Sequence, residues 1–266
     1  MCGLSAIISS MPVEIKLVGR MNQKIIHRGP DAEGVAFLDG NLFKPYAGDQ
    51  NVVSNIVLGH RRLSVIDLSD ASNQPFISKC GQYSLIYNGE VYNYKELAKK
   101  YSIKSSDSDS KVLFTLLIKF GMEVLNELNG MFSFVFISRV ESKVYFVRDR
   151  FGVKPLYYYY DGNAYYFASE IKQFTILPSW SPVEDKEKVY EYLAYGKTDT
   201  DNRTMFQDVK SVKQGHFFTL HLGQALKTEE TKWYEVNKLQ MAKKDSELIS
   251  EFKSILESSI SIRLRA

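Results

Sequence analysis

Hydrophobic and polar positions alternate in short runs over the first two-thirds of the chain, a pattern typical of half-buried β-strands. The 17 Tyr and 16 Phe favour the same conformation. The pair Asn88-Gly89 directly follows one apolar run and is a signal for a hairpin-type turn. We expect strands at residues 2–9, 35–38, 57–62, 83–87, 132–137, 143–148, 156–160, 164–168, 216–221 and 233–236.

Apolar residues spaced three and four apart predict helices between and after these strands. The clearest helix covers residues 108–120 and ends at Gly121, a favourable C-cap. Further helical segments are expected at 13–26, 94–101, 189–194 and from 243 onwards. The last of these carries an apolar stripe with no matching element: Leu248, Phe252, Ile255, Leu256 and Ile260.

Composition places the chain among ordinary globular proteins: 266 residues, 44% hydrophobic, 24% charged, with a net charge of +3. Its dispersed basic residues do not indicate nucleic acid or a membrane surface as a partner. No apolar run approaches a membrane span, and Cys2 and Cys80 do not form a disulfide framework. The four histidines and two cysteines lack metal-ligand spacing. We therefore expect a cytoplasmic protein without a metal site.

The position of Cys2 suggests a chemistry. Removal of Met1 would leave a cysteine with both a thiol and a free α-amine. The amine has an ordinary pKa of about 7.7–8.0, so it can act as a base near neutral pH. Nucleophile and base would then come from one residue.

Several segments combine with Cys2 into a larger set of motifs. They are His27-Arg28-Gly29-Pro30-Asp31, Leu58 to Asp67, Tyr87-Asn88-Gly89-Glu90-Val91-Tyr92-Asn93, Ser108 to Leu113, Arg148 to Tyr158, and Ala168-Ser169-Glu170-Ile171-Lys172. In order and spacing this set resembles the glutaminase domain of class II glutamine amidotransferases. Among these enzymes it is most similar to the asparagine synthetase family. The resemblance covers nearly the whole chain.

The resemblance implies an α+β fold of the N-terminal-nucleophile hydrolase type, an αββα four-layer sandwich with two antiparallel sheets between helices. It implies a glutaminase domain over residues 1–236, with 237–266 as a linker and the first helix of a truncated ATP-dependent synthetase domain. The expected activity is hydrolysis of glutamine to glutamate and ammonia through a γ-glutamyl thioester. The ammonia would feed synthesis of asparagine, or of a related amide, by the C-terminal domain.

The resemblance also assigns roles to residues. Catalysis falls to Cys2 as nucleophile, with Asn88 and Gly89 as oxyanion donors. Substrate binding falls to Arg62 on the glutamine α-carboxylate, to Glu90 and Asp109 on its α-ammonium, and to Leu63 and Val65. Asp107 competes with Asp109 for its role, and Asp109 could instead be only a helix N-cap. The family often has Glu where this chain has Lys111. His27 and His60 are interpreted as structural, because the N-terminal amine removes the need for a histidine base.

No cofactor is expected in this chain, whereas ATP and Mg²⁺ are implied for the synthetase domain. No Ser-Gly-Gly-x-Asp-Ser loop for ATP occurs in the sequence. The expected partners are glutamine as substrate and the chain's own C-terminal synthetase domain, and a homodimer stays open. Two alternatives also stay open: a class II amidotransferase with a sugar-phosphate or phosphoribosyl acceptor domain, and a non-catalytic glutamine-sensing or interaction module.

Overall fold

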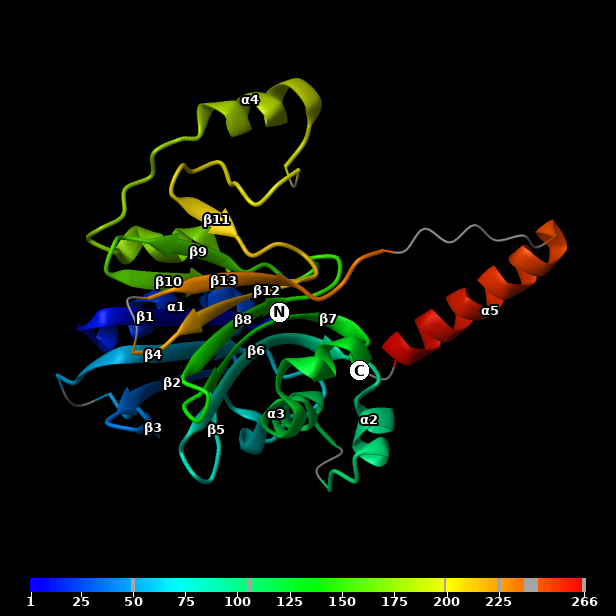
Figure 1. Ribbon diagram of the computed structural model, residues 1–266, viewed down its shortest axis with the longest axis horizontal. Coiled ribbons are helices and arrows are strands. Elements are labelled where there is room, and N and C mark those ends of the chain that lie inside the picture. Colours follow the sequence, from blue (N-terminus) through cyan, green and yellow to red (C-terminus); the bar gives the residue numbers. More distant parts are fainter. Residues whose placement is uncertain (49–50, 105–106, 199, 224–225, 237–243, 265–266) are drawn as a thin grey trace.

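The computed structural model describes residues 1–48, 51–104, 107–198, 200–223, 226–236 and 244–264. Within them the named strands form two antiparallel sheets (Figure 1). The first has the order β11-β9-β10-β1-β4-β2-β3 and the second β13-β12-β8-β7-β6-β5. The strands are β1 Gly3–Glu14, β2 Ala32–Asp39, β3 Leu42–Pro45, β4 Val53–Arg62, β5 Phe76–Ile77, β6 Tyr83–Val91, β7 Gly130–Ser138, β8 Lys143–Arg148, β9 Tyr157–Tyr160, β10 Ala164–Ala168, β11 Val209–Ser211, β12 His216–His221 and β13 Thr228–Lys232.

Helices flank the two sheets in Figure 1. The α-helices are α1 Lys16–Gln23, α2 Tyr94–Lys100, α3 Asp109–Phe120, α4 Lys186–Tyr195 and α5 Asp245–Arg263. Short 3₁₀ segments lie at Ile26–Arg28, Asp70–Ser72, Gly121–Glu127 and Ile171–Ile176.

Three apolar clusters show how the layers stack. Side chains alternate between the two faces of a strand, so β1 contributes to two of the clusters. Leu4 and Ala6 of β1 lie between the sheets, in the same cluster as Val135 of β7. Ile7 is on the other face of β1, in the same cluster as Val18 of α1. On the outer face of the second sheet, side chains of β6 and β7 pack against α2 and α3. The order helix, sheet, sheet, helix confirms the predicted αββα sandwich.

The first predicted helix begins later in the structure than the sequence pattern suggests. Val13 and Glu14 extend β1 and pair with Ser54 and Val53 of β4, after a register shift that starts at Ile8. The helix α1 therefore starts only at Lys16. The prediction of helical structure from residue 13 is wrong, because pairing with β4 outweighs the local helical spacing.

The predicted turn at Asn88-Gly89 is also wrong. The strand β6 continues through both residues to Val91, with Asn88 opposite Ser133 and Gly89 opposite Phe132. A Cβ atom on Gly89 would lie 2.3 Å from the Met131 carbonyl oxygen. Glycine is thus required here for close approach to β7 and not for a turn.

The C-terminal part of the sheets differs from the prediction as well. Residues 233–236 do not form a strand; β13 ends at Lys232. The Trp233 N–H donates to the Gly215 carbonyl at 2.9 Å, and the Trp233 ring stacks on Phe132. The strands β3, β5, β11 and β13 were not predicted, because each is short or largely polar in sequence.

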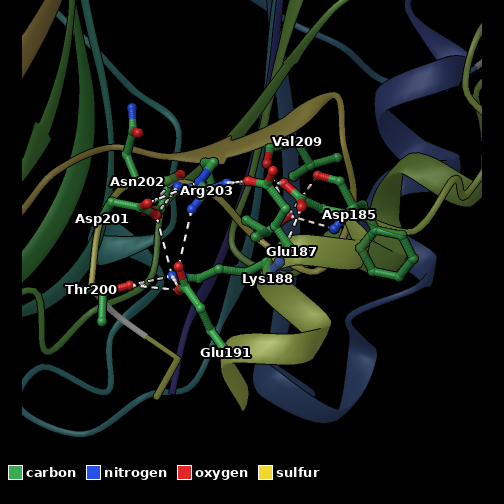
Figure 2. Close-up of polar contacts among 12 residues, drawn as sticks. Asp185, Glu187, Lys188, Glu191, Thr200, Asp201, Asn202, Arg203 and Val209 are labelled. Carbon is green, nitrogen blue, oxygen red and sulfur yellow. Dashed lines mark hydrogen bonds and ion pairs between the residues drawn. The ribbon is translucent and has the colours of Figure 1, made fainter. Parts of the chain in front are cut away.

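The helix α4 is tied to the segment that follows it by a cluster of charged side chains (Figure 2). Lys188 has a fully buried side chain, and its Nζ lies 3.1 Å from Glu191 Oε2 and 3.3 Å from Asp201 Oδ1. Arg203 bonds Asp201 at 2.9 Å and Glu187 at 3.0 Å. The polar segment at residues 200–203 is therefore anchored to α4; residue 199 lies outside the described residues.

The helix α5 forms as predicted and projects away from the sheets in Figure 1. It has no buried residue within its described part, and Phe252, Ile255 and Ile260 of the apolar stripe are more than half exposed. Near its end, the Arg263 guanidinium lies 4.7 Å from the centre of the Tyr92 ring. Among the described residues, neither α5 nor any other helix has the length and apolarity that a membrane span needs.

Candidate active site

A cavity of about 130 Å³ opens at the ends of β1, β4 and β6. The structure brings all the sequence-predicted site residues together in its wall: Cys2, Arg62, Leu63, Val65, Asn88, Gly89, Glu90 and Asp109. The pairing of β1 with β4, with Gly3 opposite Arg61, places Cys2 next to the end of β4.

The Cys2 sulfur is held by one neighbouring residue. The Leu63 N–H donates to Sγ at 3.4 Å, and the thiol faces the Leu63 carbonyl oxygen at 3.6 Å. Burial raises the pKa of the Cys2 thiol, while the Leu63 hydrogen bond, the α-amine and Arg62 lower it. A thiolate at this position therefore depends on the charges around it.

The N-terminal backbone is fixed by Arg28. Its Nε donates to the Cys2 carbonyl at 2.9 Å, and its Nη1 donates to Glu170 Oε1 at 3.0 Å. Burial lowers the pKa of the Met1 α-amine, with Arg28 and Lys154 acting in the same direction. Cys2 and Asp31 act in the opposite direction, and burial has the largest effect.

Asn88 carries an unpaired donor in the cavity wall. Asn88 is 1% exposed, and within the described residues its Nδ2 is buried without a hydrogen-bond partner. Buried polar groups are nearly always hydrogen-bonded, so an orphaned donor requires an explanation. An oxygen atom of a bound substrate would supply the partner.

Gly89 offers a second donor on the same strand. Tyr87 N–H donates to Gln74 Oε1 at 2.7 Å and Val91 N–H to Asp109 Oδ2 at 3.1 Å, both on the side of β6 away from β7. Backbone N–H groups alternate in direction along a strand, so that of Gly89 points to the same side. The sequence predicted this donor on a turn, whereas the structure supplies it from a strand.

Arg62 lies 6% exposed at the end of β4 and is tied to the loop that follows it. Its Nη1 donates to the Ser69 carbonyl at 2.8 Å and to Asn73 Oδ1 at 2.7 Å, and its Nη2 donates to the Asp67 carbonyl. A guanidinium has five N–H groups, so these three bonds leave two. Two parallel donors suit a carboxylate.

Lys111 stands where the family often has Glu. It forms an ion pair with Asp67, in the loop that follows β4. Its Nζ lies 2.8 Å from Asp67 Oδ2. That carboxylate also accepts from the Ser72 hydroxyl at 2.5 Å and from the Ser69 N–H at 2.8 Å. Lys111 and these hydrogen bonds hold the pKa of Asp67 well below its usual range. Through Asp67, Lys111 connects α3 to the loop that holds Arg62.

Two acidic residues line the cavity from different elements, Glu90 from β6 and Asp109 from α3. Asp109 is the first residue of α3, and Ser108 is the N-cap, so Asp109 is not itself the cap. Its Oδ2 accepts from the Tyr87 hydroxyl at 2.7 Å, and burial raises the pKa of its carboxyl. Glu90 lies in the cavity wall on β6, whereas Asp107 does not line the cavity.

The two histidines that were interpreted as structural, His27 and His60, bond to protein groups. His60 is 1% exposed, and its Nε2 lies 3.0 Å from the Tyr87 carbonyl oxygen. Burial lowers the pKa of His60 to about 4, so the ring is neutral near pH 7. His27 pairs with Glu170 at 3.0 Å. Neither histidine lines the cavity.

The sequence interpretation gave no role to several wall residues, among them Gln74, Tyr87 and Lys154. Gln74 bonds the backbone of Tyr87 with both ends of its amide, at 2.7 and 3.3 Å. Tyr87 in turn orients Asp109. Gln74 gave no motif signal, but Lys154 lies inside the quoted segment Arg148 to Tyr158.

Comparison with known proteins defines the class. The family described as "Glutamine amidotransferase domain" matches residues 1–234. The chain therefore belongs to the glutamine amidotransferase domain family. Among solved structures, the glutamine phosphoribosylpyrophosphate amidotransferase of B. subtilis covers 88% of this chain and 49% of its own, with a TM-score of 0.65 and 18% identity. That likeness shows the shared fold.

Curated relatives place the chain within the class. Asparagine synthetase (glutamine-hydrolyzing) 1 of Bacillus subtilis is 30% identical over 100% of this chain and 40% of its own length. A Methanocaldococcus jannaschii protein named as a glutamine-hydrolyzing asparagine synthetase is 32% identical over 100% of this chain and 53% of its own length. The chain is thus homologous to the glutamine-hydrolysing part of asparagine synthetases, and it spans about half the length of these relatives or less.

Proposed function

We propose that this chain hydrolyses glutamine to glutamate and ammonia with Cys2 as nucleophile. The observation that carries the proposal is the pairing, in one cavity, of the Cys2 sulfur with the orphaned amide donor of Asn88. A thiol nucleophile and an unpaired donor are the two groups that attack on an amide carbon requires. Membership of the glutamine amidotransferase domain family supports glutamine as the substrate.

The proposed reaction begins once Met1 has been removed. The Cys2 α-amine takes the thiol proton, and Sγ attacks the side-chain amide carbon of glutamine. Negative charge develops on the amide oxygen, where Asn88 Nδ2 and the Gly89 N–H donate. One such donor contributes about 2.7–4 kcal/mol in the transition state.

Collapse of the tetrahedral intermediate breaks the C–N bond. The protonated amine gives its proton to the leaving nitrogen, which departs as ammonia, and a γ-glutamyl thioester remains on Cys2. Water then attacks the thioester with the amine as base, and the thiol leaves with its proton restored. Glutamate is released and the enzyme returns to its starting state.

The other wall residues would hold the amino-acid end of glutamine. The two free N–H groups of Arg62 suit the α-carboxylate, and Asp109 with Glu90 suits the α-ammonium. Leu63 and Val65 would contact the aliphatic part of the substrate, since both line the cavity. These roles separate binding from the chemistry at Cys2.

For the longer protein, we propose synthesis of asparagine or a related amide from the released ammonia. The relatives that share 30–32% identity with this chain carry the asparagine synthetase name, whereas the structural neighbour with a phosphoribosyl acceptor shares 18%. ATP and Mg²⁺ would act in the synthetase part and not in this cavity. A reducing cytoplasmic location is proposed with it, because the Cys2 thiol must stay free.

An assay of glutamine hydrolysis tests the proposal. The chain, processed at Met1, should release glutamate and ammonia in equal amounts from glutamine alone. Supplied with aspartate, ATP and Mg²⁺, the same chain should make no asparagine. Binding of glutamine without any release of ammonia would instead identify a sensing module.

Replacing Arg62 with lysine should separate binding from catalysis. Lysine keeps the charge but loses the planar pair of donors, so KM for glutamine should rise about 10- to 100-fold with a smaller change in kcat. Steady-state kinetics give both constants. Arg20→Lys on the exposed face of α1 is the matched control and should leave KM unchanged. An Arg62→Lys variant with normal KM would remove Arg62 from the binding site.

A further inference from the structure

Lys154 is a buried cation in the cavity wall to which the proposed reaction gives no part. It is 6% exposed and lines the cavity together with Met1, Cys2 and Glu90. Within the described part of the chain, its Nζ makes no hydrogen bond or ion pair, and burial lowers its pKa. A lysine is rarely buried without a partner, so its charge calls for a function in the cavity.

The loop that presents Lys154 is built by its own backbone contacts. The Asp149 carboxylate is 1% exposed and accepts the backbone N–H groups of Phe151, Val153 and Lys154 at 3.0, 3.0 and 2.9 Å. One Asp149 oxygen also accepts from the Phe132 N–H at 3.2 Å, which joins the loop to β7. The backbone at Lys154 is therefore rigidly placed.

Arg148 closes the same loop from the other side. Its guanidinium donates to the carbonyl oxygens of Gly152, Lys154 and Val212 at 2.8, 3.0 and 2.9 Å. Gly152 has a φ of +68°, which favours glycine, and a Cβ there would lie 3.1 Å from the guanidinium. The contacts of Arg148, Asp149 and Gly152 thus hold Lys154 in the wall of the cavity.

The other cations beside Cys2, Arg28 and Arg62, make hydrogen bonds to neighbouring groups. Arg28 bonds the Cys2 carbonyl and Glu170, and Arg62 bonds the loop after β4. Lys154 differs because its side chain, buried in the same cavity wall as Cys2 and Met1, makes no hydrogen bond or ion pair among the described residues. The charged and titratable groups around the thiol are the α-amine, Arg28, Asp31, Arg62, Tyr87, Glu90, Asp109, Asp149 and Lys154.

We propose that the Lys154 ammonium is a positioning charge that favours the thiolate of Cys2 and the neutral form of the α-amine beside it. A nearby cation stabilises a thiolate and disfavours protonation of an amine. Stabilisation of the thiolate assists loss of the thiol proton and offsets the burial of Cys2, whereas the effect on the amine raises the fraction of free enzyme in which the amine is neutral before the step. This inference rests on the proposed function, and it assigns a purpose to a motif that the glutamine contacts leave unused.

The test is the pH dependence of Cys2 alkylation by iodoacetamide, followed by mass spectrometry of the Cys2 peptide. In Lys154→Met, which fills the same space without charge, the midpoint should move up by about one pH unit. In Lys154→Arg the midpoint should equal that of the unmodified chain. Cys80, which is exposed and outside the cavity, is alkylated in the same sample and provides an internal control.

The inference is overturned if Lys154→Met alkylates with the midpoint of the unmodified chain, or if Lys154→Arg shifts as much as Lys154→Met. Lys154→Gln replaces Lys154→Met if the methionine variant fails to fold, as judged by circular dichroism. The measurement needs no turnover of glutamine. A chain that never hydrolyses glutamine but shows the shift would refute the proposed function and leave the charge effect intact.

Discussion

Replacing Cys2 with alanine should abolish glutamine hydrolysis, with a loss of about 10⁴-fold or more in kcat. The thiol is the group expected to form the thioester, and the methyl group of alanine cannot form one. The fold should remain, because only Leu63 bonds the Cys2 sulfur within the described residues. Release of glutamate, followed by an enzyme-coupled assay, gives the rate.

The matched control is Cys80→Ala. Cys80 is exposed and lies outside the cavity, so this variant should hydrolyse glutamine at the normal rate. Thermal unfolding of both variants should match the unmodified chain to within a few degrees. Cys2→Ala with appreciable kcat would show that another residue is the nucleophile.

Replacing Asn88 with alanine should lower kcat about 10²- to 10³-fold and change KM little. Its Nδ2 acts on charge that develops only in the transition state, so the loss appears in kcat. In the free protein Nδ2 has no partner within the described residues, so its removal breaks no hydrogen bond that this group makes. The two constants come from steady-state kinetics with glutamine.

Asn55→Ala supplies a comparison on the same sheet as Cys2. Asn55 is half-buried on β4, and its Nδ2 donates to the Ser9 carbonyl at 3.0 Å, away from the cavity. Its removal should leave kcat unchanged. An Asn88→Ala variant that raises KM alone would make Asn88 a ground-state binding residue and remove it from the oxyanion hole.

The sequence motifs grouped residues that the structure places in one cavity, but they did not predict the course of the backbone through it. Cys2 and Asp109 are 107 residues apart in the sequence, and Arg62 lies between them. Only the set of motifs suggested that these three residues meet. The alternation of apolar residues predicted most of the strands in the two sheets, because one face of each strand packs in a core.

The misplaced turn at Asn88-Gly89 has a clear cause. Asn-Gly is a turn signal on local grounds, but β7 pairs with β6 through both residues. Tertiary pairing outweighs the local preference, and the glycine is used for close packing against Met131. The proposed oxyanion donors thus occupy a position where local rules indicate a turn.

Lys154 could not be identified from its residue type. Lysine is usually exposed, and nothing in its neighbours' hydropathy predicts burial. The signal was present in Asp149 and Gly152, whose roles as a backbone acceptor and a residue with positive φ appear only in the folded loop. Similarly, the connection that Lys111 makes to the loop after β4 depends on its ion pair with Asp67, which the sequence did not predict.

Cys2, freed of Met1, should form a thioester with glutamine. Mass spectrometry of the chain quenched in acid during turnover tests it most directly. We expect chains that begin at Cys2, with a fraction carrying one γ-glutamyl group on the Cys2 peptide. Full turnover by chains that retain Met1, or turnover without any glutamyl group on Cys2, would contradict the account.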